Sequence, residues 1–192
     1  MGLSAGVVYI SEPNVGLAAA VSLGLVRGDA LPITSSEDSG FPSDNIVRVA
    51  SWRDWSAVVA GTEIFIPIEK DLSSSLASLS IGRRVFCWVT QSTAGCVLFE
   101  FHDNGKLCRK WSECEGQILE EIGAPLLEEA GLVDMSTYEC GPIHDEWSML
   151  RLAQALVGLS EDEHFELQGT SYPTNPDLIA PPSKKKPWWK VW

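Results

Sequence analysis

The stretch Asp71-Leu72-Ser73-Ser74-Ser75-Leu76-Ala77-Ser78-Leu79 begins the part of the chain that decides the fold. Its leucines at positions 72, 76 and 79 recur at the spacing of one helical face. Asp71 is able to cap the first turn, and Gly82 can end the helix. The sequence therefore predicts a helix over residues 71–79.

Three apolar stretches follow this helix and have the composition of β-strands. They are residues 84–90 (R-V-F-C-W-V-T), 97–101 (V-L-F-E-F) and 106–111 (K-L-C-R-K-W). Asp103-Asn104-Gly105 separates the second from the third and predicts a tight turn, because Asn and Gly both tolerate positive φ. We expect a three-stranded antiparallel β meander packed by helices, in a single α+β domain with an extended C-terminal tail.

The remaining elements are predicted from composition and periodicity. Expected strands are residues 7–10, 45–50 and 63–68, and expected helices are residues 15–25, 118–130 and 145–156, with a helical turn at 160–163. Residues 32–45 predict a loop. Five prolines occur among the last 24 residues, which favours an extended segment. We therefore expect a globular domain over residues 1–168 and a Pro-rich segment with a basic-aromatic tail over residues 169–192.

Composition limits the possible partners. The chain has 192 residues, 45 % of them hydrophobic, and eight tryptophans, which is enough to build a core. Its formal net charge of −12 argues against direct binding to nucleic acid, because phosphates and carboxylates repel each other. Basic proteins are the natural partners of such a surface, although an acidic surface also aids solubility.

The cysteines and the N-terminal region favour residence in the cytoplasm. Five cysteines without a C-x-x-C pair predict free thiols in a reducing compartment. Cys87, Cys96 and Cys108 lie in strand-like runs and are expected in the core. The apolar residues 15–26 are too few to span a bilayer, and no Lys or Arg precedes them as in a secretory signal.

Evidence for enzymatic chemistry is weak. Cys140, His144 and Glu146 have metal-compatible spacing, but a zinc site needs a second pair of ligands that the sequence lacks. A helix N-terminus explains the same residues. We therefore predict no catalytic residue, no metal and no cofactor, and expect His102 and His164 to face solvent. The alternative is a small enzyme with a carboxylate/histidine site around His144 and Asp145.

The charge distribution points to a binding surface. Between Ser112 and Ser183 the chain has fifteen acidic residues and one basic residue, Arg151. Complementary charge speeds association and selects partners. The carboxylates predicted to contact a basic partner are Glu113, Glu115, Glu120, Glu121, Glu128, Glu129, Asp145 and Glu146.

The charge reverses in the last nine residues, which contain four lysines, three tryptophans and no acid. The side chains predicted to make contacts are Lys184, Lys185, Lys186, Trp188, Trp189 and Trp192. The segment could dock on an acidic groove of its own body or of a second copy, or be recognised as a peptide by another protein. It could also make weak contact with a membrane surface, as in a membrane-peripheral adaptor.

The order of elements from residue 72 to residue 158 resembles a known class of protein. Strands at 83–90 and 96–101, the turn at 103–107, Gly123-Ala124-Pro125-Leu126 and the helix reaching Leu156-Val157-Gly158-Leu159 carry the resemblance. Taken together, they resemble bacterial small α/β immunity proteins that are paired with secreted toxins. The resemblance implies a cytoplasmic inhibitor without catalytic residues, acting through its acidic surface on a basic toxin or effector.

Overall fold

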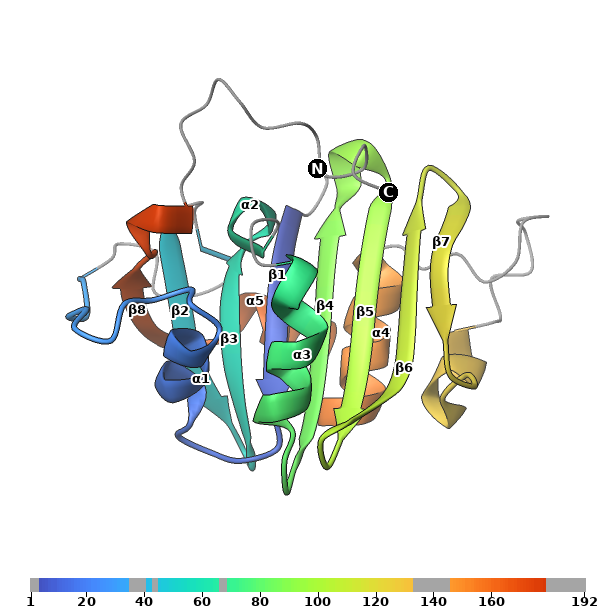
Figure 1. The fold of residues 1–192 in the computed structure, drawn as a ribbon, viewed down its shortest axis with the longest axis horizontal. Helices are drawn as coiled ribbons and strands as arrows, with labels where there is room; N and C mark the ends of the chain where they lie inside the picture. Colours follow the sequence, from blue (N-terminus) through green and yellow to red (C-terminus); the bar gives the residue numbers. More distant parts are fainter. Residues whose placement is uncertain (1–3, 35–40, 43–44, 66–68, 133–145, 179–192) are drawn as a thin grey trace.

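The computed structural model describes residues 4–34, 41–42, 45–65, 69–132 and 146–178. An antiparallel sheet of eight strands forms its centre, in the order β7-β6-β5-β4-β1-β3-β2-β8 (Figure 1). The strands are β1 (Ser4–Ile10), β2 (Ile46–Trp52), β3 (Trp55–Gly61), β4 (Arg84–Gln91), β5 (Cys96–Asp103), β6 (Lys106–Cys114), β7 (Gln117–Ile122) and β8 (Gly169–Pro173). This α+β, single-domain architecture confirms the predicted fold class.

Helices cover both faces of the sheet. In Figure 1, α1, α2 and α3 lie in front of the strands, and α4 and α5 lie behind them. The α-helices are α1 (Gly16–Ser22), α2 (Thr62–Phe65), α3 (Glu69–Leu79), α4 (Glu146–Val157) and α5 (Glu161–Glu166), and the 3-10 helices are η2 (Ser92–Ala94), η3 (Leu127–Leu132) and η4 (Pro176–Leu178). None of the helices in the described residues is long and apolar enough to cross a membrane.

Each face of the sheet has its own core. The face under α4 is rich in aromatic side chains, including Phe86, Trp88 and Phe99. The face under α1, α2 and α3 is mainly aliphatic, with Val58 and Leu76 at its centre. Because both faces are buried, the central strands are apolar along their whole length rather than alternating.

The predicted helix and meander are confirmed as α3, β4, β5 and β6. The turn between β5 and β6 has positive φ at Asn104 (47°) and Gly105 (81°), as the sequence predicted. The helix expected over residues 145–156 is α4. The helical turn expected at 160–163 is α5, which begins with a capping box between Ser160 and Glu163.

Two predicted elements are wrong. The strand expected over residues 63–68 is the helix α2, as far as residue 65, and residues 66–68 lie outside the described part. The helix expected over residues 118–130 is instead the strand β7 followed by η3. Both faces of β7 are largely exposed, so it lacks the alternation of a half-buried strand, and the composition resembled that of a helix.

The sheet also extends further than predicted. β3 was not anticipated, although all seven of its residues are buried. Residues 169–173 form β8, which pairs with β2 from Ile46↔Pro173 to Ala50↔Gly169. The folded part of the chain therefore continues past residue 168, at least to Leu178.

Candidate interaction edge

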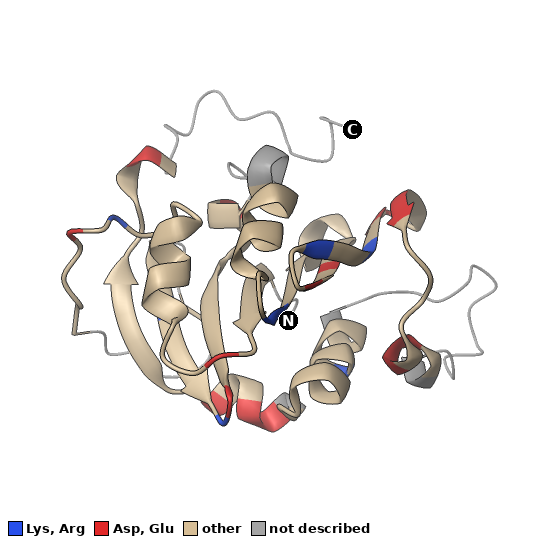
Figure 2. Ribbon diagram, turned by 60° about the horizontal axis from the view of Figure 1, so that its bottom comes forward, with Lys and Arg blue, Asp and Glu red and all other residues tan. Residues whose placement is uncertain are grey.

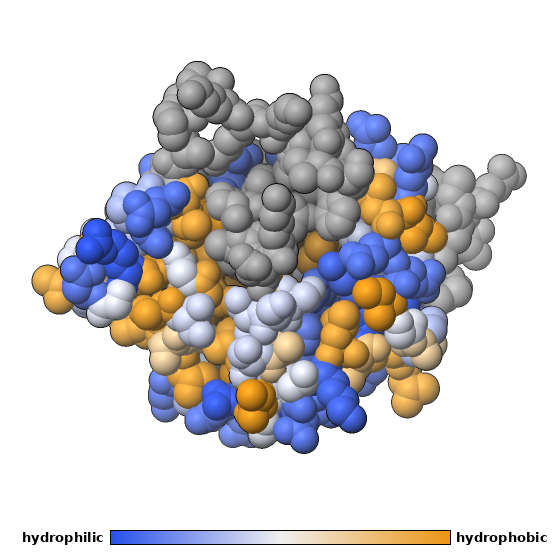
Figure 3. All heavy atoms as spheres, in the orientation of Figure 1, coloured by the Kyte–Doolittle hydropathy of each residue, from blue (hydrophilic) through white to orange (hydrophobic). Residues whose placement is uncertain are grey.

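In the described part of the chain, the sheet ends at β7, and we call the outer side of this strand open because no described strand pairs with it. Among the described residues, β7 pairs with β6 and with no other strand. The large apolar side chains exposed along β7 and η3 are Ile118, Leu119, Ile122 and Leu127, and Leu127 is 91 % exposed. Figure 3 shows apolar residues among hydrophilic ones on the side of the molecule where β7 lies. We refer to residues 117–132, which comprise β7 and η3, as the β7 edge.

A buried arginine holds the β7 edge to the sheet on the α4 side. Arg109 of β6 donates from Nε to Glu129 Oε1 (3.0 Å) and from Nη2 to Glu129 Oε2 (3.1 Å). Its Nη1 donates to Glu121 Oε1 (2.9 Å) and to the Gly123 carbonyl (3.0 Å). Burial alone would lower the pKa of Arg109, but hydrogen bonds to Glu129 and Glu121 outweigh it and raise the pKa. One guanidinium thus joins β6, β7 and η3.

A lysine has the same role on the α3 side of the sheet. Lys110 Nζ lies 2.6 Å from Glu120 Oε2 and 3.3 Å from Glu100 Oε1. Glu100 is buried and also bonds to His102 Nε2, at 2.8 Å, and to the Ser73 hydroxyl. Burial raises the pKa of Glu100, but the hydrogen bonds from His102 and Ser73 and the charge of Lys110 lower it overall. This carboxylate is therefore ionised inside an otherwise apolar face.

The structure divides the predicted partner-binding carboxylates into two groups. Glu120 and Glu121 are partly exposed but already bonded to Lys110 and Arg109. Glu129 was expected on the surface, and this is wrong, because it is buried against Arg109. The sequence could not show this, since the Arg109–Glu129 contact depends on how η3 folds back onto β6.

The second group lies within the β7 edge or beside it and is partly or fully exposed. Figure 2 shows acidic residues in red on the segments at the right of the view, where β7 and η3 lie. Among the described residues, no ion pair involves Glu113, Glu115 or Glu128. Glu115 is exposed in the turn between β6 and β7. Partial burial raises the pKa of Glu113. Asp145, the side chain of Glu146 and the tail residues 184–192 lie outside the described residues.

The histidines differ from the prediction. His102 and His164 are both buried, so the expectation that they face solvent is wrong. His164 Nδ1 lies 2.8 Å from the Tyr9 hydroxyl, and burial lowers the pKa of His164 to about 4. His144 lies outside the described residues. Within the described part of the chain, no three His, Cys, Asp or Glu side chains come together as metal ligands.

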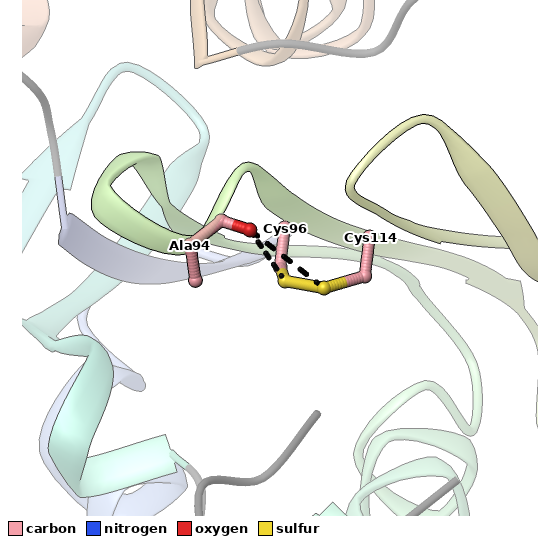
Figure 4. The surroundings of a disulfide bond; sticks show 3 residues. All are labelled: Ala94, Cys96 and Cys114. Carbon is pink, nitrogen blue, oxygen red and sulfur yellow. Dashed lines mark hydrogen bonds between the residues drawn. A yellow bond between two sulfur atoms is a disulfide. The ribbon is translucent and has the colours of Figure 1, made fainter. Parts of the chain in front are cut away.

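The cysteines also differ from the prediction. Cys96 and Cys114 form a disulfide beside the Ala94 carbonyl, where β6 leads into the turn before β7 (Figure 4). The two residues are opposed in the β5–β6 register, a pairing that the sequence alone does not fix. Cys87 is buried, which confirms its place in the core, whereas Cys108 is exposed and its predicted burial is wrong.

A pocket of about 310 Å³ lies at the opposite side of the sheet, where β2 and β8 meet the start of α1. Its polar side chains are Asn14, Ser51, Gln168 and Thr170. None of its described lining residues can act as an acid or base at neutral pH. The β7 edge is therefore the stronger candidate for a functional site.

The described residues thus form an α+β protein in which one edge strand of the sheet, β7, has exposed apolar and acidic side chains and no described partner on its outer side. The chain belongs to the DUF6928 family, a protein family of unknown function, whose model matches residues 31–134. The match runs from before β2 to just after η3 and so includes the whole β7 edge. No curated protein and no solved structure matches the chain.

Proposed function

We propose that this protein is a non-enzymatic binding protein that holds a basic protein partner at the β7 edge. The observation that carries the proposal is that β7 has no second partner strand among the described residues, together with four exposed apolar side chains along β7 and η3, Ile118, Leu119, Ile122 and Leu127. Proteins usually protect the edges of their sheets, because an open strand pairs readily with another chain. A cluster of exposed apolar side chains is likewise typical of an interaction surface.

The charge at this edge supports a basic partner. Arg109 and Lys110 are each shared between two carboxylates, which leaves the ion-pair network negative. Glu115 and Glu128 add further negative charge at the turn before β7 and in η3. Because complementary charge raises the association rate and selects partners, a basic protein fits this edge better than an acidic one.

The particular form that we propose is an immunity-type inhibitor acting in the cytoplasm of a bacterial cell against a basic toxin or effector. It rests on the resemblance in the order of elements and on the acidic edge. The alternatives, an enzyme around His144 and a membrane-peripheral adaptor, depend on residues outside the described part of the chain. No feature of the described residues favours either alternative.

The test is a pull-down from the native cells with a tagged chain that ends at Ser183, so that the basic tail takes no part in the binding. We expect one basic protein to be retained at low salt and released at high salt, because the attraction between surface charges is screened. The variant carrying Glu115→Lys and Glu128→Lys should lose this protein, since neither side chain takes part in the ion pairs that hold the edge.

The matched control carries Asp54→Lys and Asp177→Lys, which make the same change in net charge at exposed positions away from the β7 edge. The control should keep the partner. Equal retention by the wild type and both variants would show that the β7 edge is not the binding surface. Retention of no stoichiometric protein at either salt concentration would contradict the proposed function itself.

A further inference from the structure

The disulfide between Cys96 and Cys114 lies at the base of the β6–β7 hairpin. Cys114 is the last residue of β6 and pairs with Gln117 of β7. The two residues of the turn between them have positive φ (53° and 77°). The backbone N–H of Glu115, in this turn, donates to the Gly95 carbonyl (3.0 Å). The disulfide and this hydrogen bond therefore join the turn to the start of β5.

The β6–β7 hairpin is attached differently at its two ends. The end that contains Ile122 is held by the ion pairs of Arg109 and Lys110. A register shift between Ser112 and Glu113 interrupts the pairing of β6 with β7. Beyond it lies the turn end, residues 113–118, which has two residue pairs and no ion pair among the described residues. Within the described part of the chain, the disulfide is the firmest attachment of the turn end.

One backbone carbonyl lies beside both sulfurs of the disulfide. The Ala94 oxygen is 3.1 Å from Cys96 Sγ and 3.8 Å from Cys114 Sγ (Figure 4). The sulfurs of a disulfide have no hydrogen to donate, whereas a thiol is a weak donor. Both sulfurs lie in buried residues. This carbonyl can therefore accept an S–H only after reduction, and it then stabilises the reduced pair.

We propose that Cys96 and Cys114 form a redox switch that controls binding at the β7 edge. The inference rests on the proposed function, because it concerns the regulation of the same surface in a reducing cytoplasm, where disulfides are usually transient or redox-sensing. In the oxidised protein, the turn end is fixed and presents Glu115 and Ile118, which is 54 % exposed. In the reduced protein, the turn end opens more often, and binding is weaker because these residues must be ordered first.

The exchange uses a low-molecular-weight thiol, R–SH, as the reductant. Its thiolate attacks Cys114 Sγ, because Cys114 is 8 % exposed and Cys96 is fully buried. The S–S bond breaks, a mixed disulfide forms between R and Cys114, and Cys96 Sγ leaves as a thiolate and takes up a proton. A second R–SH, also as its thiolate, attacks the R sulfur, which releases R–S–S–R and Cys114 as a thiolate that takes up the second proton. Two electrons and two protons thus pass from the reductant to the protein, and R–S–S–R reverses the reaction.

The first experiment equilibrates the purified full chain in mixtures of reduced and oxidised glutathione. Alkylation and peptide mass spectrometry measure the fraction of the Cys96–Cys114 pair that is reduced. We expect the pair to change from disulfide to dithiol within the range of glutathione ratios that a cytoplasm maintains. The matched control carries Cys108→Ala and Cys140→Ala, outside the pair, and should give the same titration curve. A pair that stays fully oxidised or fully reduced across this range is not a switch.

The second experiment compares hydrogen exchange in the oxidised and the reduced chain. We expect the amides of residues 114–118 to exchange at least about tenfold faster in the reduced chain, because the turn end opens more often. The amides of residues 120–122 should change less, since the ion pairs hold that end. The variant carrying Cys96→Ser and Cys114→Ser should match the reduced chain and should not respond to glutathione. Equal exchange of residues 114–118 in the oxidised and reduced chains would overturn the proposal.

The third experiment repeats the pull-down with the tagged full chain, kept oxidised, and with the variant carrying Cys96→Ser and Cys114→Ser. The variant should bind the basic protein at least about tenfold more weakly. Equal retention by the two chains would show that the disulfide does not control the β7 edge. Retention of no partner by either chain would contradict the proposed function. The glutathione titration and the hydrogen exchange need only the purified chain, so they decide whether the switch exists in either case.

Discussion

The two edge strands of the sheet, β7 and β8, differ in how far the described residues cover their outer sides. At the β8 edge, Ile33 forms a bridge with Ser171, and its N–H donates to the Ser171 carbonyl (2.9 Å). Just after β8, Asn175 donates from its backbone to Leu25 O (2.8 Å) and from its side chain to Gly24 O (3.0 Å). Among the described residues, nothing comparable covers the outer side of β7. An edge strand whose outer side is not covered can pair with another chain, so this difference supports β7 rather than β8 as the binding edge that we propose.

The edges also differ in what attaches them to the sheet. Arg109 and Lys110 bind the β7 edge through charged hydrogen bonds on both faces. The β8 edge is attached by backbone pairing with β2 and by apolar packing, in which Tyr172 is buried. Substitutions of Arg109 and Lys110 should therefore loosen β7 more than β8.

The largest effect is expected from Arg109→Leu, which removes both hydrogen bonds from Arg109 to the buried Glu129 carboxylate. Removal of one member of a buried ion pair costs about 3–5 kcal/mol of unfolding free energy. Denaturant unfolding measures the loss, and hydrogen exchange should show faster exchange in β7 than in β8. Arg109→Lys keeps the charge but loses the two-point bond to Glu129, so its cost should be smaller. An equal loss of protection in both edges would show that Arg109 supports the whole core rather than the β7 edge.

A different sensitive point lies at the centre of the sheet, where the buried His164 of α5 contacts Tyr9 of β1 and Trp88 of β4. Its pKa is about 4 in the folded protein and 6.5 in the unfolded chain, so the unfolded state binds a proton first as the pH falls. His164 thus disfavours folding progressively from about pH 6.5 down to about pH 4, by about 3 kcal/mol in total. His164→Gln should remove this part of the pH dependence in denaturant unfolding. An unchanged pH profile in the variant would mean that His164 is not the group responsible.

A third prediction concerns the disulfide between Cys96 and Cys114, on the β7 side of the sheet. Reduction should lower the unfolding free energy by about 3 kcal/mol, since the disulfide closes a loop of 18 residues. Alkylation without reductant should label Cys108 in the folded protein and leave Cys96 and Cys114 unlabelled. The control Cys108→Ala should behave as the wild type. Equal stability with and without reductant would exclude a structural role for this disulfide.

The sequence predicted those helices and strands whose local residue pattern matches their environment in the folded protein. Leucine spacing in α3, the Asn104-Gly105 turn and the apolar runs of β4 and β5 each indicated their element directly. The strand β7 was not predicted, because both of its faces are largely exposed. A strand without a buried face lacks the alternation of apolar and polar residues by which strands are recognised. The exposure that makes β7 a candidate binding surface is thus also the reason that its residue pattern did not indicate a strand.

The candidate site was predicted in part, for a related reason. Composition indicated an acidic surface, and in the structure Glu115 is exposed there and Glu128 is partly exposed. Composition did not indicate that Arg109 of β6 would bind Glu121 and Glu129. Nor did it indicate that Lys110 would bind Glu120. These contacts depend on the β6–β7 register and on η3, which join residues that no local pattern relates.

The smallest predicted effects distinguish a side chain that stabilises an edge strand from one that is exposed and available for binding. Asn175→Ala removes the hydrogen bond to Gly24 O beside β8 and should cost about 1 kcal/mol, with faster exchange in β8 alone. Ile122→Ser on β7 should cost less than about 0.5 kcal/mol, because Ile122 is already 41 % exposed. The same Ile122→Ser change should nevertheless weaken binding at the β7 edge, measured as the loss of the basic protein in the pull-down. If Ile122→Ser destabilised the fold more than Asn175→Ala, β7 would be a structural strand, and its exposed side chains would not be evidence for a binding surface.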